Sequence, residues 1–193
     1  MNYEAALTIS YTHLFAERHQ LYTGLNTNII SKNSRNYYIQ AEGFPDEDMD
    51  FLPSALQYMK DGKPSGSEAK MRSVGLVSSV NYSYDNRYYT DLAYRLDGSS
   101  QFGSDRRFAP FYSAGIGWNL HNERFLKDKN LFNLLKLRAS FGQTGSQNFN
   151  VYQAIATYSY YMSDRYNQWL GAYQMALENK NLEWQKTNKW NHF

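Results

Sequence analysis

The chain has 193 residues and a formal net charge of +2, and its composition is 42% hydrophobic and 17% aromatic, with 18 Tyr and no Cys. These values exclude a disordered chain and a basic nucleic-acid-binding protein, and the absence of Cys excludes a disulfide scaffold and a thiolate metal site. No stretch approaches the roughly 18 consecutive apolar residues of a membrane helix, which excludes a helical membrane protein but not a β-barrel, whose strand residues are half polar.

The first elements in chain order are two predicted β-strands. Residues 3–14 alternate apolar and polar side chains with the period of two that is typical of a strand, and residues 21–30 do so more weakly after the polar turn FAERHQ. Residues 31–71 are rich in Gly, Pro, Asp and Lys and are predicted to form a large loop. A short helix is expected within this loop, beginning near Pro53 and ending at residues 61–62.

A tight hairpin is predicted next. Residues 72–84 and 88–97 alternate in the same way, and the Asp85-Asn86 pair between them is typical of a β-hairpin turn. The strand 88–97 has one largely apolar face and one polar face. The apolar face carries Tyr88, Thr90, Leu92, Tyr94 and Leu96, and the polar face carries Tyr89, Asp91, Ala93, Arg95 and Asp97.

Three further strands are predicted toward the C-terminus. Residues 111–120 and 135–142 alternate clearly, and the final stretch LEWQKTNKWNHF has the composition of a strand. Between the last two of these strands, residues 143–181 form a second long insertion that is polar and aromatic. Its segment VYQAIATYSYY has strand-like composition without a clear period of two, so the sequence leaves open whether the insertion contains its own hairpin.

The lengths of the connections indicate which class of β-protein this is. A soluble β-sandwich also alternates, and it is the alternative that base rates favour. However, short turns (FAERHQ, Asp85-Asn86, and the middling HNERFLKDKN) alternate here with long segments, as periplasmic turns alternate with extracellular loops in outer-membrane barrels. The sequence therefore predicts an all-β fold, an antiparallel transmembrane β-barrel, with GSSQFGSDRR at the extracellular rim and Tyr82, Tyr84 and Tyr88 in an aromatic girdle.

Four segments carry a resemblance to a known family. SYDNRYYTDLAYRLDGSSQFG, FAPFYSAGIGWNLHNERFL, LLKLRASFGQTGSQN and NKNLEWQKTNKWN, in this order and spacing, resemble the barrel of the SusC/RagA family of TonB-dependent outer-membrane transporters. The resemblance implies a location in the cell outer membrane of a Gram-negative bacterium of the Bacteroidetes type. It also implies import of glycans, oligosaccharides or peptides with a SusD-like surface lipoprotein and the TonB complex as partners. Nucleic acid is not among the expected partners.

The length of the chain indicates a fragment of such a barrel. Large transporters of this type use about 22 strands, and the sequence predicts about seven. Residues 1–193 are therefore expected to be a fragment of the C-terminal barrel domain, forming a partial, open barrel with long extracellular loops, with no plug domain and no signal peptide. Because unpaired strand edges cannot lie in lipid, the fragment alone is expected to be inactive. The alternative function is that of a soluble β-sandwich that binds glycans.

No catalytic, cofactor-binding or metal-ligating residue is predicted, and no cofactor is expected. The sequence has no nucleophile elbow, no P-loop and no dinucleotide fingerprint, so an enzyme is not expected. The acidic run PDEDMD, residues 45–50, is interpreted as a solvated loop rather than a calcium site, because it lacks the Gly and the distal Glu of an EF-hand. The histidines lack the spacing of metal ligands: they are His13, His19, His121 and His192.

Two other groups of residues have both a structural and a functional interpretation. Arg95 and Asp97 are interpreted as an ion pair on the barrel wall, with a role in the selectivity of the lumen as the alternative. The aromatic residues of the second insertion either stack on sugars or pack the loop onto its neighbours, and the sequence does not decide between these: they are Tyr158, Tyr160, Tyr161, Tyr166, Trp169 and Tyr173.

Overall fold

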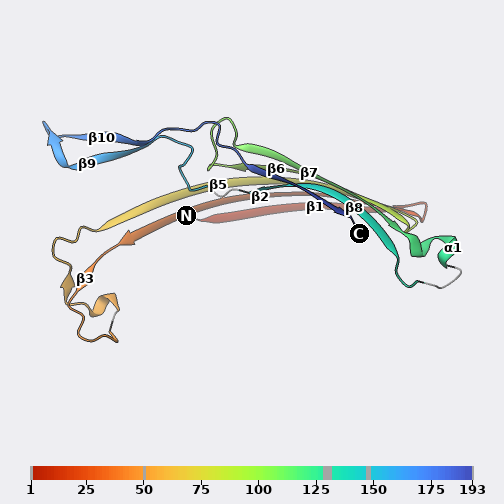
Figure 1. Cartoon of the computed structure of the whole chain (residues 1–193), viewed down its shortest axis with the longest axis horizontal. Coiled ribbons are helices and arrows are strands. Elements are labelled where there is room, and N and C mark those ends of the chain that lie inside the picture. Colours follow the sequence, from red (N-terminus) through yellow and green to blue (C-terminus); the bar gives the residue numbers. More distant parts are fainter. Residues whose placement is uncertain (1, 50, 128–131, 147–148, 193) are drawn as a thin grey trace.

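The computed structural model describes residues 2–49, 51–127, 132–146 and 149–192, without the side chains of residues 127, 162–164 and 166. Its main element is a seven-stranded antiparallel sheet in which the strands follow one another in sequence order (Figure 1). The strands of this sheet are β1 (Tyr3–Phe15), β2 (His19–Tyr38), β5 (Ser65–Tyr84), β6 (Tyr88–Ser99), β7 (Phe108–Asn119), β8 (Lys136–Ser146) and β11 (Gln185–His192). Seven strands were predicted, and all seven lie in this sheet.

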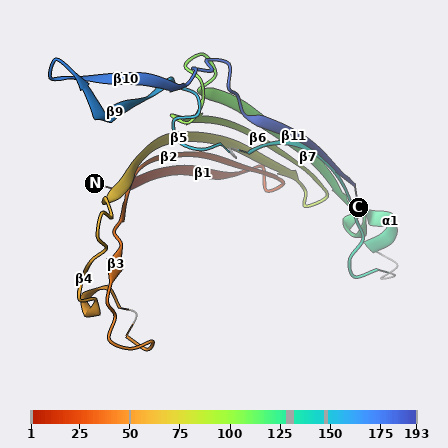
Figure 2. The same cartoon turned by 60° about the vertical axis from the view of Figure 1, so that its left-hand side comes forward.

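The sheet is a single arched layer, and its two edges are β1 and β11 (Figure 2). The described strands do not close into a barrel, which agrees with the predicted partial barrel. In a β-sandwich, the apolar face would be covered by a second sheet. Here Leu92 and Tyr94 remain about half exposed, at 50% and 47%, so the sandwich alternative is wrong.

Two strands are much longer than predicted. β2 and β5 are paired over 20 residues each, from His19↔Tyr84 to Tyr38↔Ser65, so both ends of the predicted 31–71 loop are strand. The sequence does not reveal this extension because polar side chains occupy both of its faces, which removes the period of two. The connecting segment contains only short elements: β3 (Ala41–Glu42), η1 (Leu52–Ser54) and β4 (Gln57–Tyr58).

The helix predicted near Pro53 is reduced to the three-residue 3₁₀ turn η1. Pro53 suits the first turn of a helix, but Ala55 is already extended, with φ −69° and ψ 144°. The next backbone N–H, that of Leu56, donates to the carbonyl of Glu42 instead of to a helical acceptor. Pairing of this segment with the β3 region therefore ends the helix before a second turn forms.

The predicted hairpin turn at Asp85 and Asn86 is confirmed. Both residues have positive φ, 50° and 52°, and the Arg87 N–H donates to the Tyr84 carbonyl over 2.9 Å. Positive φ at two successive positions is the geometry that matches the twist of the flanking strands, and Asp and Asn tolerate it. This turn is therefore specified locally by its own sequence.

The β1–β2, β5–β6 and β7–β8 connections lie at one end of the sheet, called the short-turn end, and the β2–β5, β6–β7 and β8–β11 connections lie at the other, called the long-loop end (Figure 1). The β7–β8 connection, residues 120–135, is an exception in length, because it is longer than the β6–β7 connection, residues 100–107. The short-turn end also carries η2 (Leu120–Asn122) and α1 (Arg124–Lys127). At the long-loop end, the second insertion contains a separate hairpin, β9 (Thr157–Tyr166) and β10 (Trp169–Ala176), which extends away from the sheet (Figure 2). In the part of the chain that the structure describes, no helix has the length and apolar character needed to cross a membrane.

Candidate functional site: the two faces and two ends of the sheet

The sheet register brings the apolar side chains of five neighbouring strands onto one surface, which we call the apolar face. Successive residues of a strand point to opposite faces, and paired residues share a face. The apolar face comprises Ala5, Leu7, Ile9, Tyr11, His13 and Phe15 of β1; His19, Leu21, Thr23, Leu25, Thr27 and Ile29 of β2; Val74, Leu76, Ser78, Val80, Tyr82 and Tyr84 of β5; Tyr88, Thr90, Leu92, Tyr94, Leu96 and Gly98 of β6; and Phe108, Pro110, Tyr112, Ala114, Ile116 and Trp118 of β7. None of these residues is Asp, Glu, Lys or Arg.

The height of the apolar face matches the apolar part of a bilayer. From Val74 to Tyr84 it extends ten residues along β5, or about 34 Å at about 3.4 Å per residue. With the usual strand tilt of about 40°, this length corresponds to about 26 Å across a membrane, close to the roughly 25 Å apolar band of outer-membrane barrels. The alternation of apolar and polar residues in the segment 88–97 thus continues across these five strands.

The opposite surface, the polar face, carries the charged residues of the same strands. Arg95 and Asp97 form the predicted ion pair, with 2.6 Å between Arg95 Nε and Asp97 Oδ2. Asp97 is only 8% exposed, whereas Arg95 is exposed, so the carboxylate lies against the sheet and the guanidinium covers it. Arg138 of β8 approaches Asp91 of β6 at 3.9 Å on the same face. A row of such groups requires water, not hydrocarbon, in front of it.

A row of aromatic rings ends the apolar face at its short-turn end. The ring centroids of His19 and Tyr84 lie 4.8 Å apart, those of Tyr84 and Tyr88 6.5 Å, and those of Tyr88 and Trp118 6.0 Å. Of the three tyrosines predicted in a girdle, Tyr84 and Tyr88 lie in this row. Tyr82 lies one row deeper and donates or accepts a hydrogen bond with His19 Nδ1 at 2.7 Å. The row has the composition of a membrane-interface belt.

Glu123, in the connector between η2 and α1, fixes the polar ends of this aromatic row. Its carboxylate accepts hydrogen bonds from the Tyr88 hydroxyl at 2.7 Å, the Trp118 indole N–H at 3.0 Å and the Arg87 guanidinium at 3.2 Å. Arg87 also pairs with Asp85 at 2.8 Å. The Tyr88 and Trp118 donors hold the pKa of Glu123 below its ordinary value. Glu123 therefore stays ionised and joins the β5–β6 turn to the connector after β7.

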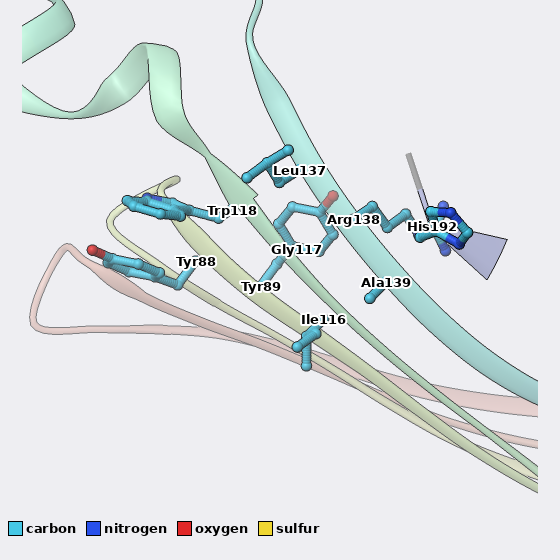
Figure 3. A pocket seen from close by; sticks show the side chains of 9 residues that line it. All are labelled: Tyr88, Tyr89, Ile116, Gly117, Trp118, Leu137, Arg138, Ala139 and His192. Carbon is cyan, nitrogen blue, oxygen red and sulfur yellow. The ribbon is translucent and has the colours of Figure 1, made fainter. Parts of the chain in front are cut away.

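An apolar hollow of about 680 Å³ lies next to this end, between β7 and β8, with Tyr88, Ile116, Trp118 and Leu137 in its lining (Figure 3). The Tyr89 ring lies over Gly117, where a Cβ would overlap it, and Lys136 Nζ lies 4.2 Å from the centroid of that ring. Gly117 is therefore required for the close approach of an aromatic ring to a neighbouring strand. Neither Glu123 nor this packing was predicted from the sequence.

A small aromatic cluster, which we call the rim cluster, packs together the loops at the long-loop end of the sheet. Phe102, only 1% exposed, stacks on Trp184 at 4.5 Å and meets Phe149 edge to face at 5.7 Å, and Phe111 meets Trp184 at 5.7 Å. The Gly103 N–H also donates to the Leu182 carbonyl over 3.0 Å. The segment GSSQFG thus forms an anchor for the second insertion, a role that sequence reasoning missed. The signal in the sequence that could have indicated this role is a single large aromatic residue, Phe102, among small and polar ones.

The comparisons with known proteins agree with this geometry, although no family model matches the chain. TonB-dependent receptor SusC of Bacteroides thetaiotaomicron is 37% identical over 126 residues, which are 61% of this chain and 12% of SusC. TonB-dependent receptor P3 of Formosa agariphila is 34% identical over 128 residues, or 66% of this chain and 13% of P3. The structure of the RagAB peptide importer in a closed-closed state matches 98% of this chain and 21% of its own, with a TM-score of 0.80 and 25% identity. The chain therefore resembles a segment of a SusC/RagA-type TonB-dependent receptor, in sequence over about two thirds of its length and in fold over nearly all of it.

The chain is short compared with these relatives. It spans 12% to 13% of the length of these two curated receptors and 21% of the RagAB chain. The RagAB importer in an open-open state gives a similar match, with a TM-score of 0.79 and 26% identity over 98% of this chain. These relatives are named as receptors and importers, not as enzymes.

The remaining groups considered in the sequence analysis do not converge on a ligand within the described residues. Among the described residues, no three of His, Cys, Asp or Glu are placed to hold a metal ion. The described part of the acidic run, residues 45–49, is exposed, and its last residue lies outside the described residues. His121 Nδ1 lies 3.0 Å from the Leu135 carbonyl, and His13 packs against Phe15 at 4.2 Å.

The aromatic residues of the β9–β10 hairpin are exposed. Tyr158, Tyr160 and Trp169 are each more than half exposed, and Tyr161 packs against Tyr173 within the hairpin at 4.9 Å. The side chain of Tyr166 lies outside the described residues. In this structure the hairpin therefore presents these rings largely to the exterior, and stacking on sugars and packing onto neighbours both stay predictions.

Proposed function

We propose that this chain is a section of the wall of an outer-membrane TonB-dependent transporter. In this arrangement the apolar face contacts the acyl chains of the bilayer, and the polar face lines the water-filled lumen. The observation that carries the proposal is the apolar face itself, which contains no charged residue over about 26 Å of membrane depth. A closed barrel satisfies the backbone hydrogen bonds, so only the outward side chains need be apolar.

The transport activity belongs to the complete receptor. The likeness to SusC and to the RagAB peptide importer supports import of oligosaccharides, other glycans or peptides, with a SusD-like lipoprotein on the extracellular side and the TonB complex supplying energy. The plug and the segment that contacts TonB are proposed to lie outside residues 1–193. The two free edges, β1 and β11, pair with further strands of the receptor, because open edges are not stable in lipid.

Two adjacent residues of β6 provide the test. Leu92 lies in the middle of the apolar face, and Ala93 lies on the polar face beside Ser79 and Ser113. In the complete receptor, Leu92→Lys is expected to destabilise the barrel by about 2–4 kcal/mol, the effect of a Lys facing the middle of a bilayer. Ala93→Lys places the same charge in lumenal water and is expected to change stability by less than about 1 kcal/mol.

The measurement is the fraction of folded receptor in isolated outer membranes, read from the heat-dependent mobility of the barrel on a gel and from its unfolding temperature. A large loss for Leu92→Lys with a small one for Ala93→Lys supports the assignment of the two faces. Equal losses, or a larger loss for Ala93→Lys, would show that the apolar face does not meet lipid.

A further inference from the structure

The hairpin of β2 and β5 continues beyond the apolar face at the long-loop end. Ile29 and Val74 are its last apolar pair, and the next pairs on the same face are Ser31↔Arg72 and Asn33↔Lys70. With about 3.4 Å per residue and a tilt of about 40°, Arg72 lies about 5 Å beyond the apolar face and Lys70 about 10 Å beyond it. This is the depth of lipid headgroups.

Arg72 and Lys70 are exposed, and neither belongs to an ion pair among the described residues. The next cation on this face, Arg35, is already paired with Glu68 at 3.3 Å. Cations at an ordinary solvated surface need no partner. At this position, however, the two positive charges lie next to each other at the edge of the apolar face, which contains no charged residue.

The backbone of β5 is held in place at both positions by other segments of the long-loop end. The Arg72 N–H donates to the Ser100 hydroxyl over 2.9 Å, and the Lys70 N–H donates to the Tyr152 hydroxyl over 3.0 Å. The two side chains therefore start from fixed points about 7 Å apart on the same face. Ser31 and Asn33, opposite them on β2, add polar groups to the same patch.

We propose that Arg72 and Lys70 bind the phosphate groups of a phosphorylated lipid in the outer leaflet of the membrane. A guanidinium binds phosphate oxygens in a bidentate manner, and an ammonium binds them as a point charge. The occupant is a lipid and not a transported substrate, because both residues lie on the face that continues the apolar face and not on the polar face. This inference rests on the proposed function, since it requires that the apolar face lie in the bilayer.

The test uses the complete receptor in nanodiscs of phosphatidylcholine that contain lipid A with two phosphates, or the same lipid after removal of both phosphates. The variant is Lys70→Gln with Arg72→Gln. The control is Lys32→Gln with Lys189→Gln, which removes the same charge from the polar face. Lipid A bound to each receptor is counted by native mass spectrometry, and the unfolding temperature is measured with each lipid.

The wild-type receptor and the control are expected to prefer the phosphorylated lipid, and the Lys70/Arg72 variant is expected to bind it about 30-fold more weakly. The dephosphorylated lipid should bind equally to all three. Equal binding of phosphorylated lipid by variant and control, or full competition by millimolar inorganic phosphate, would overturn the lipid site while leaving the barrel-wall proposal intact. A wild-type receptor that does not insert into the bilayer would instead contradict the proposed function.

Discussion

The two ends of the sheet are fixed by different physical means. At the short-turn end, the Glu123 carboxylate accepts three hydrogen bonds and the ion pairs of Arg87 stay within the protein. At the long-loop end, the chain relies on the buried ring of Phe102, which stacks on the half-buried ring of Trp184. The cations Arg72 and Lys70 have no ionic partner among the described residues. The charges of Asp85, Arg87 and Glu123 are therefore satisfied within the protein, whereas those of Arg72 and Lys70 face the exterior.

Two of the three connections at the short-turn end are three-residue turns, whereas the second insertion at the long-loop end is long. A three-residue turn places its polar groups within reach of the next turn, so hydrogen bonds suffice: the Asp85 N–H donates to the Arg18 carbonyl, and the Asn119 N–H donates to the Arg87 carbonyl, both over 2.7 Å. A long insertion has too much conformational entropy for a few exposed hydrogen bonds to order it. Burial of aromatic surface supplies the additional free energy.

The largest effect in this comparison is expected from the rim cluster. Phe102→Ala removes the most buried large side chain and is expected to destabilise the long-loop end by about 3–5 kcal/mol. Limited proteolysis of the complete receptor should then cut the segment 149–184 much faster. Phe108→Ala, at a residue that is 62% exposed, is the control, and equal protease sensitivity of the two variants would contradict the anchoring role.

A glycine of β8 tests the same cluster from the other side. A Cβ at Gly145 would overlap the Phe111 ring, which is itself buried, so Gly145→Ala is expected to lower stability by about 1–3 kcal/mol. At Gly142, on the same strand, a Cβ would make an ordinary 3.4 Å contact with Ser113. Gly142→Ala should therefore have little effect on the unfolding temperature. A smaller effect at Gly145 than at Gly142 would show that Phe111 is free to move.

At the short-turn end, a pH dependence is expected. Because the pKa of Glu123 is lowered in the folded state, its contribution to stability is present above its ordinary value of 4.5 and is lost as the pH falls through the folded pKa. Glu123→Gln should therefore lower the unfolding temperature by several degrees at pH 7. The difference in unfolding temperature from wild type should shrink steadily on acidification below pH 4.5. A difference that stays constant down to pH 3 would contradict the stabilising role of the ionised Glu123 carboxylate.

The smallest effect is expected at an exposed ion pair above the apolar face. Arg35 and Glu68 are 57% and 50% exposed, so their 3.3 Å contact is screened by solvent. Arg35→Gln should change the free energy of unfolding by less than about 1 kcal/mol. An effect as large as that of Gly145→Ala would mean that this part of the hairpin is shielded from water in the receptor.

The sequence predicts the features that depend on local patterns. The alternation of residues 88–97, the turn at Asp85 and Asn86 and the pairing of Arg95 with Asp97 all follow from period two and turn chemistry, and the structure contains them. The resemblance of the GSSQFG and LKLRASFGQTGSQN segments to SusC/RagA barrels indicated the fold, and the comparisons support it.

Features that depend on contacts distant in sequence were not predictable. The pairing of Phe102 with Trp184 joins residues that are separated by most of the C-terminal half of the chain. In the sequence, nothing distinguishes the buried Glu123 from an exposed acidic residue, because its role depends on the register of β6 and β7, which brings Tyr88 and Trp118 together. The extension of β2 to Tyr38 was missed because polar side chains on both faces remove the period that identifies a strand.

The central claim is that successive residues of a strand contact lipid and lumenal water in turn. Because residues 1–193 contain no Cys, spin labels on single introduced cysteines in β6, at positions 91 to 96 of the complete receptor in a bilayer, test it directly. We expect contact with dissolved oxygen, which partitions into lipid, to be high at Leu92, Tyr94 and Leu96 and low at the residues between them, with the opposite order for a water-soluble nickel reagent. Accessibility without this alternation, or with its phase reversed, would contradict the account.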